Sequence, residues 1–463
     1  MGAMPIIFST TPEGSKELDG VKRRLSLGSM LPPELPTGAS DNPAAEVARI
    51  LSDVRRRGDA AVLEYTRKFD RVSLAADQLR VPRRQIDEAL LQADRSFLRA
   101  LDIAIENVRR YQKAMLPPAP PAIAPAGASP GSGARLAVRY EPLHRVGAYI
   151  PGGAGAYPSS VVMTVVPAQV AGVKSICLCS PMRNGRVSPA VLAAAGRLGV
   201  YEVYALGGAQ AIAALAFGTA TVASVEKIVG PGNSYVQLAK KELFGLVDID
   251  GFAGPSEVIV LADDSADAEM VAAELLAQAE HAPGSCLLIT ADAALARAVQ
   301  GRVDQQLQTL SRRDLIIQSL PRASALIVVP GHDDALNLVN DFAPEHLRIC
   351  TRHSTADADK IKNAGAIFIG PFTPVAAGDY LAGPSHVLPT SGTARVFSGL
   401  AAESFRRRIS IVEFDAAALN HAAPAIATLA RTEGFDAHAR SVEVRRSHGY
   451  SAGKGVDEPA GTR

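Results

Sequence analysis

The sequence predicts an α/β protein whose strands form mostly parallel sheets, two of them, each covered by helices on both faces. Three observations predict this class. From about residue 146 onward, short apolar runs alternate with windows of helical periodicity, which is the pattern of β-α-β units. Three of these runs lead through a glycine-rich turn into a helix. Hydrophobic residues make up 47% of the 463 residues and charged residues 21%, so the chain can form large buried cores.

The charge balance excludes several classes of function. Lys and Arg number 48 against 47 Asp and Glu, so no field of one sign favours nucleic acid or an anionic membrane. Four cysteines in a chain of this length, with no signal-like start, do not form a disulfide framework, and we expect a cytoplasmic protein. Two uncharged stretches, 146–173 and 203–225, are long enough to suggest membrane helices. Proline and glycine divide the first into a strand, a turn and a helix, and Gly207 and Gly208 divide the second in the same way.

The N-terminal third is predicted to be helical. Asn42 and Pro43 are typical of a helix start, and the apolar spacing predicts a helix over 44–57. Helical periodicity continues over 85–115. Three consecutive arginines close the first of these helices, and we interpret them as a solvated face that complements the helix dipole rather than as a nucleic-acid site.

Segments of biased composition bound the region of strands. Residues 116–133 are rich in Pro, Ala, Gly and Ser, and we predict a hinge or domain boundary there. The tail 451–463 is predicted to be frayed. The predicted strands are the apolar runs at 146–150, 175–179, 202–206, 227–229, 258–262, 286–290, 325–329 and 366–369.

Three glycine turns could approach a ligand closely. They read Tyr149-Ile-Pro-Gly-Gly-Ala-Gly-Ala-Tyr157, Leu206-Gly-Gly-Ala-Gln210 and Gly230-Pro-Gly-Asn233. The helix that follows such a turn offers free N–H groups to phosphate. None of them is a G-x-G-x-x-G with an acidic residue about twenty positions on, so the dinucleotide fingerprint is absent. A nucleotide-sized ligand and ordinary strand-to-helix turns therefore both stay open.

Two pairs of polar residues could serve a metal or a substrate. Gln278 and His281 stand three positions apart at a predicted helix end, so both can face one centre. The uncharged amide is a weak metal ligand, and spacing alone favours a capping or hydrogen-bonded histidine. Asp379 and His386 share a glycine-rich loop after the predicted strand 366–369, which is where open α/β sheets bind ligands.

Glu345 and His346 put a carboxylate beside an imidazole at a predicted helix-to-strand junction. If the junction is irregular, the two side chains serve one pocket and can move protons near neutral pH; otherwise they are a surface pair. Glu433 and His438 lie near the C-terminus, after a predicted helix.

Eight motifs follow one another along the chain. They are Tyr149-Ile-Pro-Gly-Gly, Gly207-Gly-Ala-Gln-Ala-Ile-Ala-Ala-Leu-Ala-Phe-Gly218, Gly230-Pro-Gly-Asn233, Ala253-Gly-Pro-Ser-Glu257, Gln278-Ala-Glu-His281, Ala343-Pro-Glu-His346, Ala377-Gly-Asp-Tyr380 and His386-Val-Leu-Pro-Thr390. In these motifs and their order the sequence resembles the histidinol dehydrogenase family, from about residue 15 to about residue 446. One departure is Ser385, where Asn is frequent in the family, and we expect a tolerated hydrogen-bonding variant.

The resemblance implies a fold of two Rossmann-like (incomplete dinucleotide-fold) parallel-sheet domains with small N- and C-terminal helical extensions. It implies a zinc- and NAD-dependent, four-electron oxidation of L-histidinol through L-histidinal to L-histidine, the last step of histidine biosynthesis. Two NAD and one water are used. The family is a homodimer with one zinc ion per subunit, so the implied partners are a small-molecule substrate and a second copy of the chain.

The resemblance also implies a role for each matching residue. Glu345 and His346 would be catalytic. The implied zinc ligands are Gln278, His281, Asp379 and His438, and the implied NAD contacts are Tyr149, Gln210 and Asn233. The implied substrate contacts are Ser256, Gln278, His281, His346, Asp379, His386, Glu433 and His438.

The resemblance further implies domain boundaries. The expected parts are an N-terminal extension at 1–25, a discontinuous catalytic and zinc domain of 26–126 with 256–400, an NAD-contacting domain at 127–255, a C-terminal segment at 401–450 exchanged between subunits, and a disordered tail at 451–463. Rival interpretations are a dehydrogenase of the same fold acting on another polar alcohol, such as a sulfonated diol, a zinc hydrolase in which Glu345 activates water, and a catalytically silent paralogue.

Overall fold

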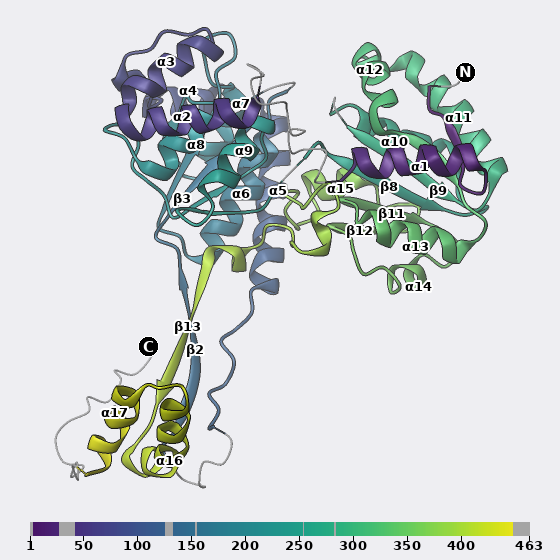
Figure 1. Cartoon of the computed structure of the whole chain (residues 1–463). Helices are drawn as coiled ribbons and strands as arrows, with labels where there is room; N and C mark the ends of the chain where they lie inside the picture. The colour runs from purple at the N-terminus through teal and green to yellow at the C-terminus, as the bar shows by residue number, and fades with distance from the viewer. Residues whose placement is uncertain are drawn as a thin grey trace. The chain divides into compact units, whose positions relative to one another are not determined.

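The computed structural model describes residues 3–26, 42–125, 133–152, 155–252, 254–281 and 284–447, and it confirms the predicted α/β class with parallel sheets (Figure 1). The predicted tail 451–463 lies outside the described residues, as does the part of the predicted hinge at 126–132. Two compact units divide the chain. The first contains residues 1–116 and 142–405, and the second contains 117–141 and 406–463.

The first unit contains a five-stranded sheet with the order β5-β4-β3-β6-β7, all parallel. Numbered along the chain, this is the order 3-2-1-4-5 of a dinucleotide-binding fold that lacks its last strand. Its strands are β3 (Arg145–Tyr149), β4 (Ser175–Cys179), β5 (Val203–Tyr204), β6 (Lys227–Val229) and β7 (Asp248–Ile249).

Helices cover both faces of the five-stranded sheet. The core on one face joins it to α4 (Arg83–Gln92), α5 (Arg95–Met115), α6 (Pro158–Ala171) and α7 (Pro189–Arg197). The core on the other face joins it to α2 (Pro43–Arg57), α3 (Asp59–Phe69), α8 (Gly208–Phe217) and α9 (Ser234–Leu243). The sheet is therefore buried on both sides, as its nearly continuous apolar strands require.

The second sheet of this unit has six parallel strands in the order β1-β10-β9-β8-β11-β12. Without β1, the order along the chain is again 3-2-1-4-5. The strands are β1 (Ile6–Phe8), β8 (Glu257–Ala262), β9 (Ser285–Thr290), β10 (Ala325–Val328), β11 (His346–Cys350) and β12 (Ala366–Ile369).

Helices also cover both faces of the six-stranded sheet. One core contains side chains of α10 (Ala268–Ala279), α11 (Ala293–Gln306) and α12 (Arg313–Ala323), and the other contains side chains of α1 (Pro12–Arg24) and α13 (His332–Phe342). The shorter α14 (Ser354–Ala358) and α15 (Val375–Tyr380) follow β11 and β12.

The helical N-terminal third forms for the predicted local reasons. The Asn42 side chain accepts the N–H groups of Ala44 and Ala45, and the first helix ends at Gly58, whose φ is 56°. The arginines at its end are exposed, as predicted. The predicted helical stretch 85–115 is two helices, because Asp94 begins a new one and accepts N–H groups of its first turn.

All the predicted strands are present, and no end is shifted by more than two residues. Three further strands of the two sheets were not predicted. β1 and β7 contain only 3 and 2 residues, too few to show a period. β11 is buried yet begins with a histidine and carries Arg348, so its sequence does not read as an apolar run.

The packing of helices α2 to α5 corrects the predicted domain boundaries. We grouped residues 26–126 with 256–400, but the described helices of that segment pack on the five-stranded sheet. The amphipathic pattern shows which face of a helix is buried and does not show which sheet buries it. The predicted extension 1–25 is likewise part of a domain core, because Ile7 of β1 pairs with Ile327 of β10.

The described residues of the second unit form a two-stranded sheet and two helices (Figure 1). β2 (Arg135–Pro142) pairs with β13 (Arg406–Glu413), and the guanidinium carbon of Arg406 lies 4.6 Å from the ring centroid of Tyr140. α16 (Ala416–Thr432) and α17 (Asp436–Ser447) pack against each other. Exchange of residues 401–450 between subunits stays a prediction. Among the described residues, no helix has the length and apolar character needed to cross a membrane.

A buried ion pair ties β11 to α10 and to the segment before α15. The Arg348 Nε lies 3.1 Å from a Glu274 oxygen, and both side chains are buried. Arg348 also donates to the carbonyl oxygens of Pro371 and Thr373, while the other Glu274 oxygen accepts the N–H of Val375 at 2.9 Å. The pair therefore fixes the start of α15.

Arg348→Met should lower the free energy of unfolding by about 3–5 kcal/mol, because it leaves the Glu274 carboxylate buried without its cation. Urea unfolding at pH 7 measures this. The matched control is Arg352→Met, which removes an exposed pair with Asp264 and should cost less than about 1 kcal/mol. Equal losses for the two variants would contradict the structural role of the buried pair.

Candidate active site

A cavity of about 820 Å³ in the first unit gathers most of the residues predicted for a site. Both sheets contribute to its wall. The predicted site residues that line it are Tyr149, Gln210, Asn233, Ser256, His281, Glu345, His346, Asp379 and His386. These come from segments spread over more than two hundred positions, and the fold brings them together.

The two sheets contribute opposite ends to this cavity. Lining residues from the five-stranded sheet follow the carboxyl ends of β3, β4, β5 and β6. In contrast, Ser256 immediately precedes β8 and Glu345 immediately precedes β11, so the six-stranded sheet contributes its amino ends. We expected Asp379 in a glycine-rich loop after β12, but it lies on α15, which runs back from β12 and brings Asp379 next to His346.

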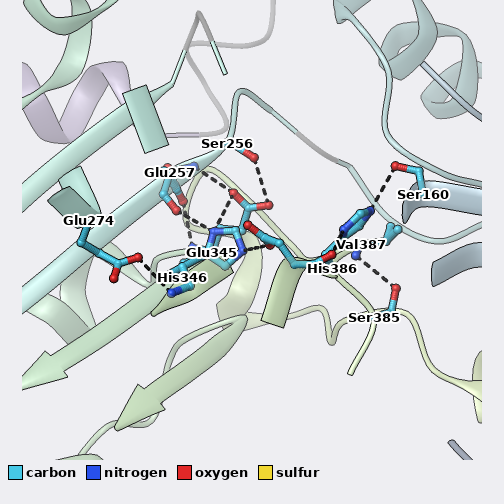
Figure 2. Close-up of polar contacts among 11 residues, drawn as sticks. Ser160, Ser256, Glu257, Glu274, Glu345, His346, Ser385, His386 and Val387 are labelled. Atoms are coloured by element: carbon cyan, nitrogen blue, oxygen red, sulfur yellow. Dashed lines mark hydrogen bonds and ion pairs between the residues drawn. The ribbon is translucent and has the colours of Figure 1, made fainter. Parts of the chain in front are cut away.

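Glu345 and His346 serve one pocket because their junction is irregular. Ala343 ends α13 with φ 50° and ψ 61°, and the chain then enters β11. The Glu345 carboxylate accepts the N–H of Glu257 at 2.8 Å and lies 3.4 Å from the Ser256 hydroxyl, which donates to it (Figure 2). The carboxylate also lies 3.5 Å from His346 Nδ1.

The hydrogen bonds of His346 fix the tautomer of its uncharged ring. Nδ1 lies 3.1 Å from the carbonyl oxygen of Glu257, and since a carbonyl only accepts, Nδ1 carries a hydrogen. Nε2 is buried, lies 3.4 Å from an Asp379 oxygen, and has no well-aligned hydrogen-bond partner among the described residues. Nε2 is therefore the nitrogen available to a molecule in the cavity.

Burial and charge shift the acidities of this group. Burial raises the pKa of Glu345 to about 7, against the attraction of His346. Burial alone would lower the pKa of His346, but the carboxylates of Glu345 and Asp379 raise it to about 9. Burial also opposes ionisation of Asp379, yet its contact with His346 holds the pKa of that carboxyl below its usual value. The group can therefore exchange protons near neutral pH.

Glu257, which was not predicted as a site residue, contacts both Glu345 and His346. One of its carboxyl oxygens accepts the N–H groups of Glu345 at 3.2 Å and Ser391 at 2.9 Å. Burial and repulsion from Glu345 raise the pKa of Glu257 to about 8, so one of the two neighbouring carboxyls keeps a proton near neutral pH. A carboxylate at the first position of an otherwise apolar strand was the signal that could have identified it.

Both ring nitrogens of His386 make hydrogen bonds. Nε2 lies 3.1 Å from the Ser160 hydroxyl and Nδ1 lies 2.8 Å from the Asp379 carbonyl oxygen (Figure 2). Burial lowers the pKa of His386. Ser385 donates to the carbonyl of Met163 at 2.9 Å, so its hydroxyl is used as a hydrogen-bonding group, as expected. Ser160 follows a glycine turn and was missed because no local pattern marks it.

The three glycine turns meet at the carboxyl edge of the five-stranded sheet. The Tyr149 hydroxyl accepts the N–H of Gly208 at 3.1 Å, which links the first turn to the second. Gly230 has φ 110°, and a Cβ there would lie 2.1 Å from the Tyr149 carbonyl oxygen, so only glycine fits. Asn233 caps α9 by accepting the N–H of Val236. Both amide atoms of Gln210 are buried without a hydrogen-bond partner among the described residues.

The predicted metal ligands are only partly gathered. α10 ends at Ala279, so Gln278 and His281 do not share a helix, although His281 N–H still donates to the Gln278 carbonyl at 3.2 Å. The Gln278 side chain is buried, and its Nε2 has no hydrogen-bond partner among the described residues. In the part of the chain that the structure describes, no group of three or more His, Cys, Asp or Glu side chains could hold a metal ion.

Two predicted site residues belong to the second unit. Glu433 is the C-cap of α16, and His438 lies in the first turns of α17. The ring of His438 has its centroid 5.4 Å from that of Phe435. Their assignment to a shared site stays a prediction.

Comparison with known proteins identifies what the chain is similar to. The family model described as histidinol dehydrogenase matches residues 36–446. Histidinol dehydrogenase of Rhodopirellula baltica is 47% identical over 409 residues, which cover 88% of each chain. That of Moorella thermoacetica is 47% identical over 435 residues, which cover 92% of this chain and 99% of the relative. The crystal structure of histidinol dehydrogenase from Elizabethkingia anophelis matches with a TM-score of 0.86 at 32% identity and covers 96% of this chain and 99% of that one.

Glu257→Gln should lower the free energy of unfolding by less than about 1 kcal/mol at pH 7, because an amide oxygen still accepts two N–H groups and no charge is lost from a protonated acid. Glu257→Ala should cost about 3 kcal/mol or more, because it leaves two buried donors unpaired and a cavity. Denaturant unfolding of both variants checks this. A glutamine variant as unstable as the alanine variant would mean that the Glu257 carboxylate is ionised in the fold.

Proposed function

The chain belongs to the histidinol dehydrogenase family, and from this premise we propose that it oxidises L-histidinol through L-histidinal to L-histidine with two NAD and one water. The observation that carries the proposal is one cavity that combines the buried group of Glu345, His346 and Asp379 with three glycine turns. The three side chains can move protons, and the glycine turns suit a dinucleotide. We further propose a cytoplasmic homodimer.

We assign a zinc ion to Gln278, His281 and Asp379, with His438 supplied by a second copy of the chain. Three features support this donor set. Asp379 and His281 line the same cavity. Gln278 has an amide atom buried without a partner among the described residues, and amide oxygen and nitrogen are interchangeable in such an assignment. Oxygen and nitrogen donors with room for substrate are typical of catalytic zinc. When bound, NAD would accept a hydride in each step and zinc would orient the imidazole and amine of the substrate.

In the first step the alcohol of histidinol loses its hydroxyl proton to Nε2 of His346, while the carbon-bound hydrogen leaves with its electron pair. Nδ1 is occupied by the Glu257 carbonyl, so Nε2 is the nitrogen that can act. An imidazole must be unprotonated before it can accept a proton. The role therefore requires that the negative charges of Glu345 and Asp379, which raise the pKa of His346, are compensated in the loaded site.

In the second step a water molecule adds to the aldehyde, and Glu345 takes a proton from that water. Burial has raised the pKa of Glu345 to about 7, so this carboxylate is a stronger base than an exposed one and can still release its proton near neutral pH. The hydrated aldehyde then loses a second carbon-bound hydrogen with its electron pair, and the product is a carboxylate. One closed cavity would retain the reactive aldehyde between the steps.

The remaining residues of the cavity would hold the reactants. We assign Tyr149, Gln210 and Asn233 to NAD, because they stand at the three glycine turns and Gln210 has an unpaired buried amide. We assign Ser256, His386 and, from the second unit, Glu433 to the substrate. Gln278, His281, His346, Asp379 and His438 would also contact the substrate at the metal and the base.

The alternative is a dehydrogenase of the same fold that oxidises another polar alcohol, such as a sulfonated diol. His386, held by Ser160, favours the imidazole substrate over that alternative. A zinc hydrolase would leave the buried amide of Gln210 and the three glycine turns without a ligand.

Glu345→Gln should slow oxidation of L-histidinal at least about a hundredfold, because the carboxylate that deprotonates water is lost. Oxidation of L-histidinol to the aldehyde should fall less than about tenfold, because His346 is retained. Single-turnover NADH formation from each substrate measures the two steps. Glu403→Gln, at an exposed position, is the control. Equal losses in both steps would contradict the division of roles, and a wild type that oxidises neither substrate would refute the proposed function.

His438→Ala should reduce bound zinc, and so should Gln278→Ala, because each removes one ligand. Mixing the two variants should restore about a quarter of wild-type activity, since about half of the dimers are mixed and half of their sites are intact. Metal analysis and activity of the refolded mixture check this. If verified mixed dimers recover nothing, His438 serves the site of its own chain and the exchanged segment is wrong.

A further inference from the structure

Asp70 is an acidic residue of the cavity that the proposed chemistry does not use. It is the C-cap of α3, and its backbone N–H donates to the carbonyl of Thr66 at 2.9 Å. Its side chain lines the cavity together with Phe69, Tyr149 and Gly208, on the side of the five-stranded sheet. The other acidic residues of the described lining, Glu345 and Asp379, belong to the group around His346.

Within the described part of the chain, one oxygen of the Asp70 carboxylate, Oδ2, is buried without a hydrogen-bond partner. Burial raises the pKa of Asp70 to about 6, so the group is still mostly ionised at neutral pH. An unpaired, partly buried carboxylate destabilises the free protein. A ligand that donates hydrogen bonds to it would offset that cost.

The topology indicates which part of a ligand would lie there. In a dinucleotide-binding fold, an acidic residue at the end of the second strand binds the 2′-hydroxyl of the adenosine ribose. The second strand of the five-stranded sheet is β4, and Ser180 and Pro181 follow it, so that position holds no acid. Pro181 nevertheless lines the cavity that Asp70 also lines. Asp70, at the end of α3, is thus the carboxylate that can take this role on the side of the five-stranded sheet.

The charge of the described side chains that line the cavity indicates which dinucleotide it can bind. They include no Lys or Arg side chain. A 2′-phosphate needs such a cation, as in proteins that bind NADP. Here it would instead meet a carboxylate, and like charges at short distance repel.

We infer that Asp70 accepts hydrogen bonds from the adenosine ribose hydroxyls of the dinucleotide and thereby selects NAD over NADP. The inference rests on the proposed function in one respect, which is that a dinucleotide occupies the three glycine turns. It adds a specificity-determining residue that lies far along the chain from all three turns.

The test compares binding of NADH and NADPH to the full-length protein, measured by nicotinamide fluorescence, so that it does not depend on turnover. The wild type should bind NADH at least about tenfold more tightly than NADPH. Asp70→Asn should weaken NADH binding about tenfold, because a charge-assisted hydrogen bond is lost, and should strengthen NADPH binding relative to NADH by at least that factor. Asp77→Asn, exposed in the short helix Ala76–Gln78 and outside the cavity, should change neither.

The outcomes separate the two proposals. Asp70→Asn should melt at pH 8 no lower than the wild type, because an unpaired charge is removed, so a loss of NADH binding in a folded variant supports the inference. An unchanged ratio of NADH to NADPH affinity in that variant overturns the inference and leaves the proposed function intact. A wild type that binds neither dinucleotide overturns both.

Discussion

The parallel pairing of β8 with β11 is the contact on which the site depends. In this pairing His346 lies opposite Val258. The residues that precede them along the chain, Glu345 and Glu257, therefore also lie side by side. Each carboxyl then accepts the backbone N–H of the other residue. Burial raises the pKa of both carboxyls, repulsion from Glu345 raises that of Glu257 further, and repulsion from Asp379 raises that of Glu345 further. The strand pairing that buries the two carboxyls therefore also brings their acidities close to neutral pH.

The rest of the cavity follows from the two sheets, which have the same strand order but present opposite ends. Carboxyl ends of the five-stranded sheet bring glycine turns and helix N-termini, which suit a large anionic ligand. Amino ends of the six-stranded sheet bring Glu345 and His346. Under the proposed function, a reactant held between them would meet the dinucleotide on one side and the proton-transfer groups on the other. The buried pair of Arg348 and Glu274 fixes the start of α15, which carries Asp379 toward His346.

The sequence predicts those structural features that depend on residues close together along the chain. The cap at Asn42, the glycine turns and the proximity of Glu345 to His346 are of this kind, and so are the strands with apolar runs. It does not predict which sheet buries an amphipathic helix, so the segment 43–115 was grouped with the wrong sheet. Nor does it reveal β1, whose pairing joins Ile7 to Ile327. Asp70 has no local pattern at all, because only the folded chain brings it to the cavity.

The measurement that tests this account most directly is the number of NADH formed per L-histidinol consumed, with zinc content determined on the same sample. We predict about two NADH per histidinol, lost on chelation and regained with zinc, because the proposed reaction places both oxidations in one cavity. One NADH per histidinol with release of the aldehyde would contradict the role of Glu345 in the second step. No NADH from a zinc-loaded sample would contradict the proposed substrate.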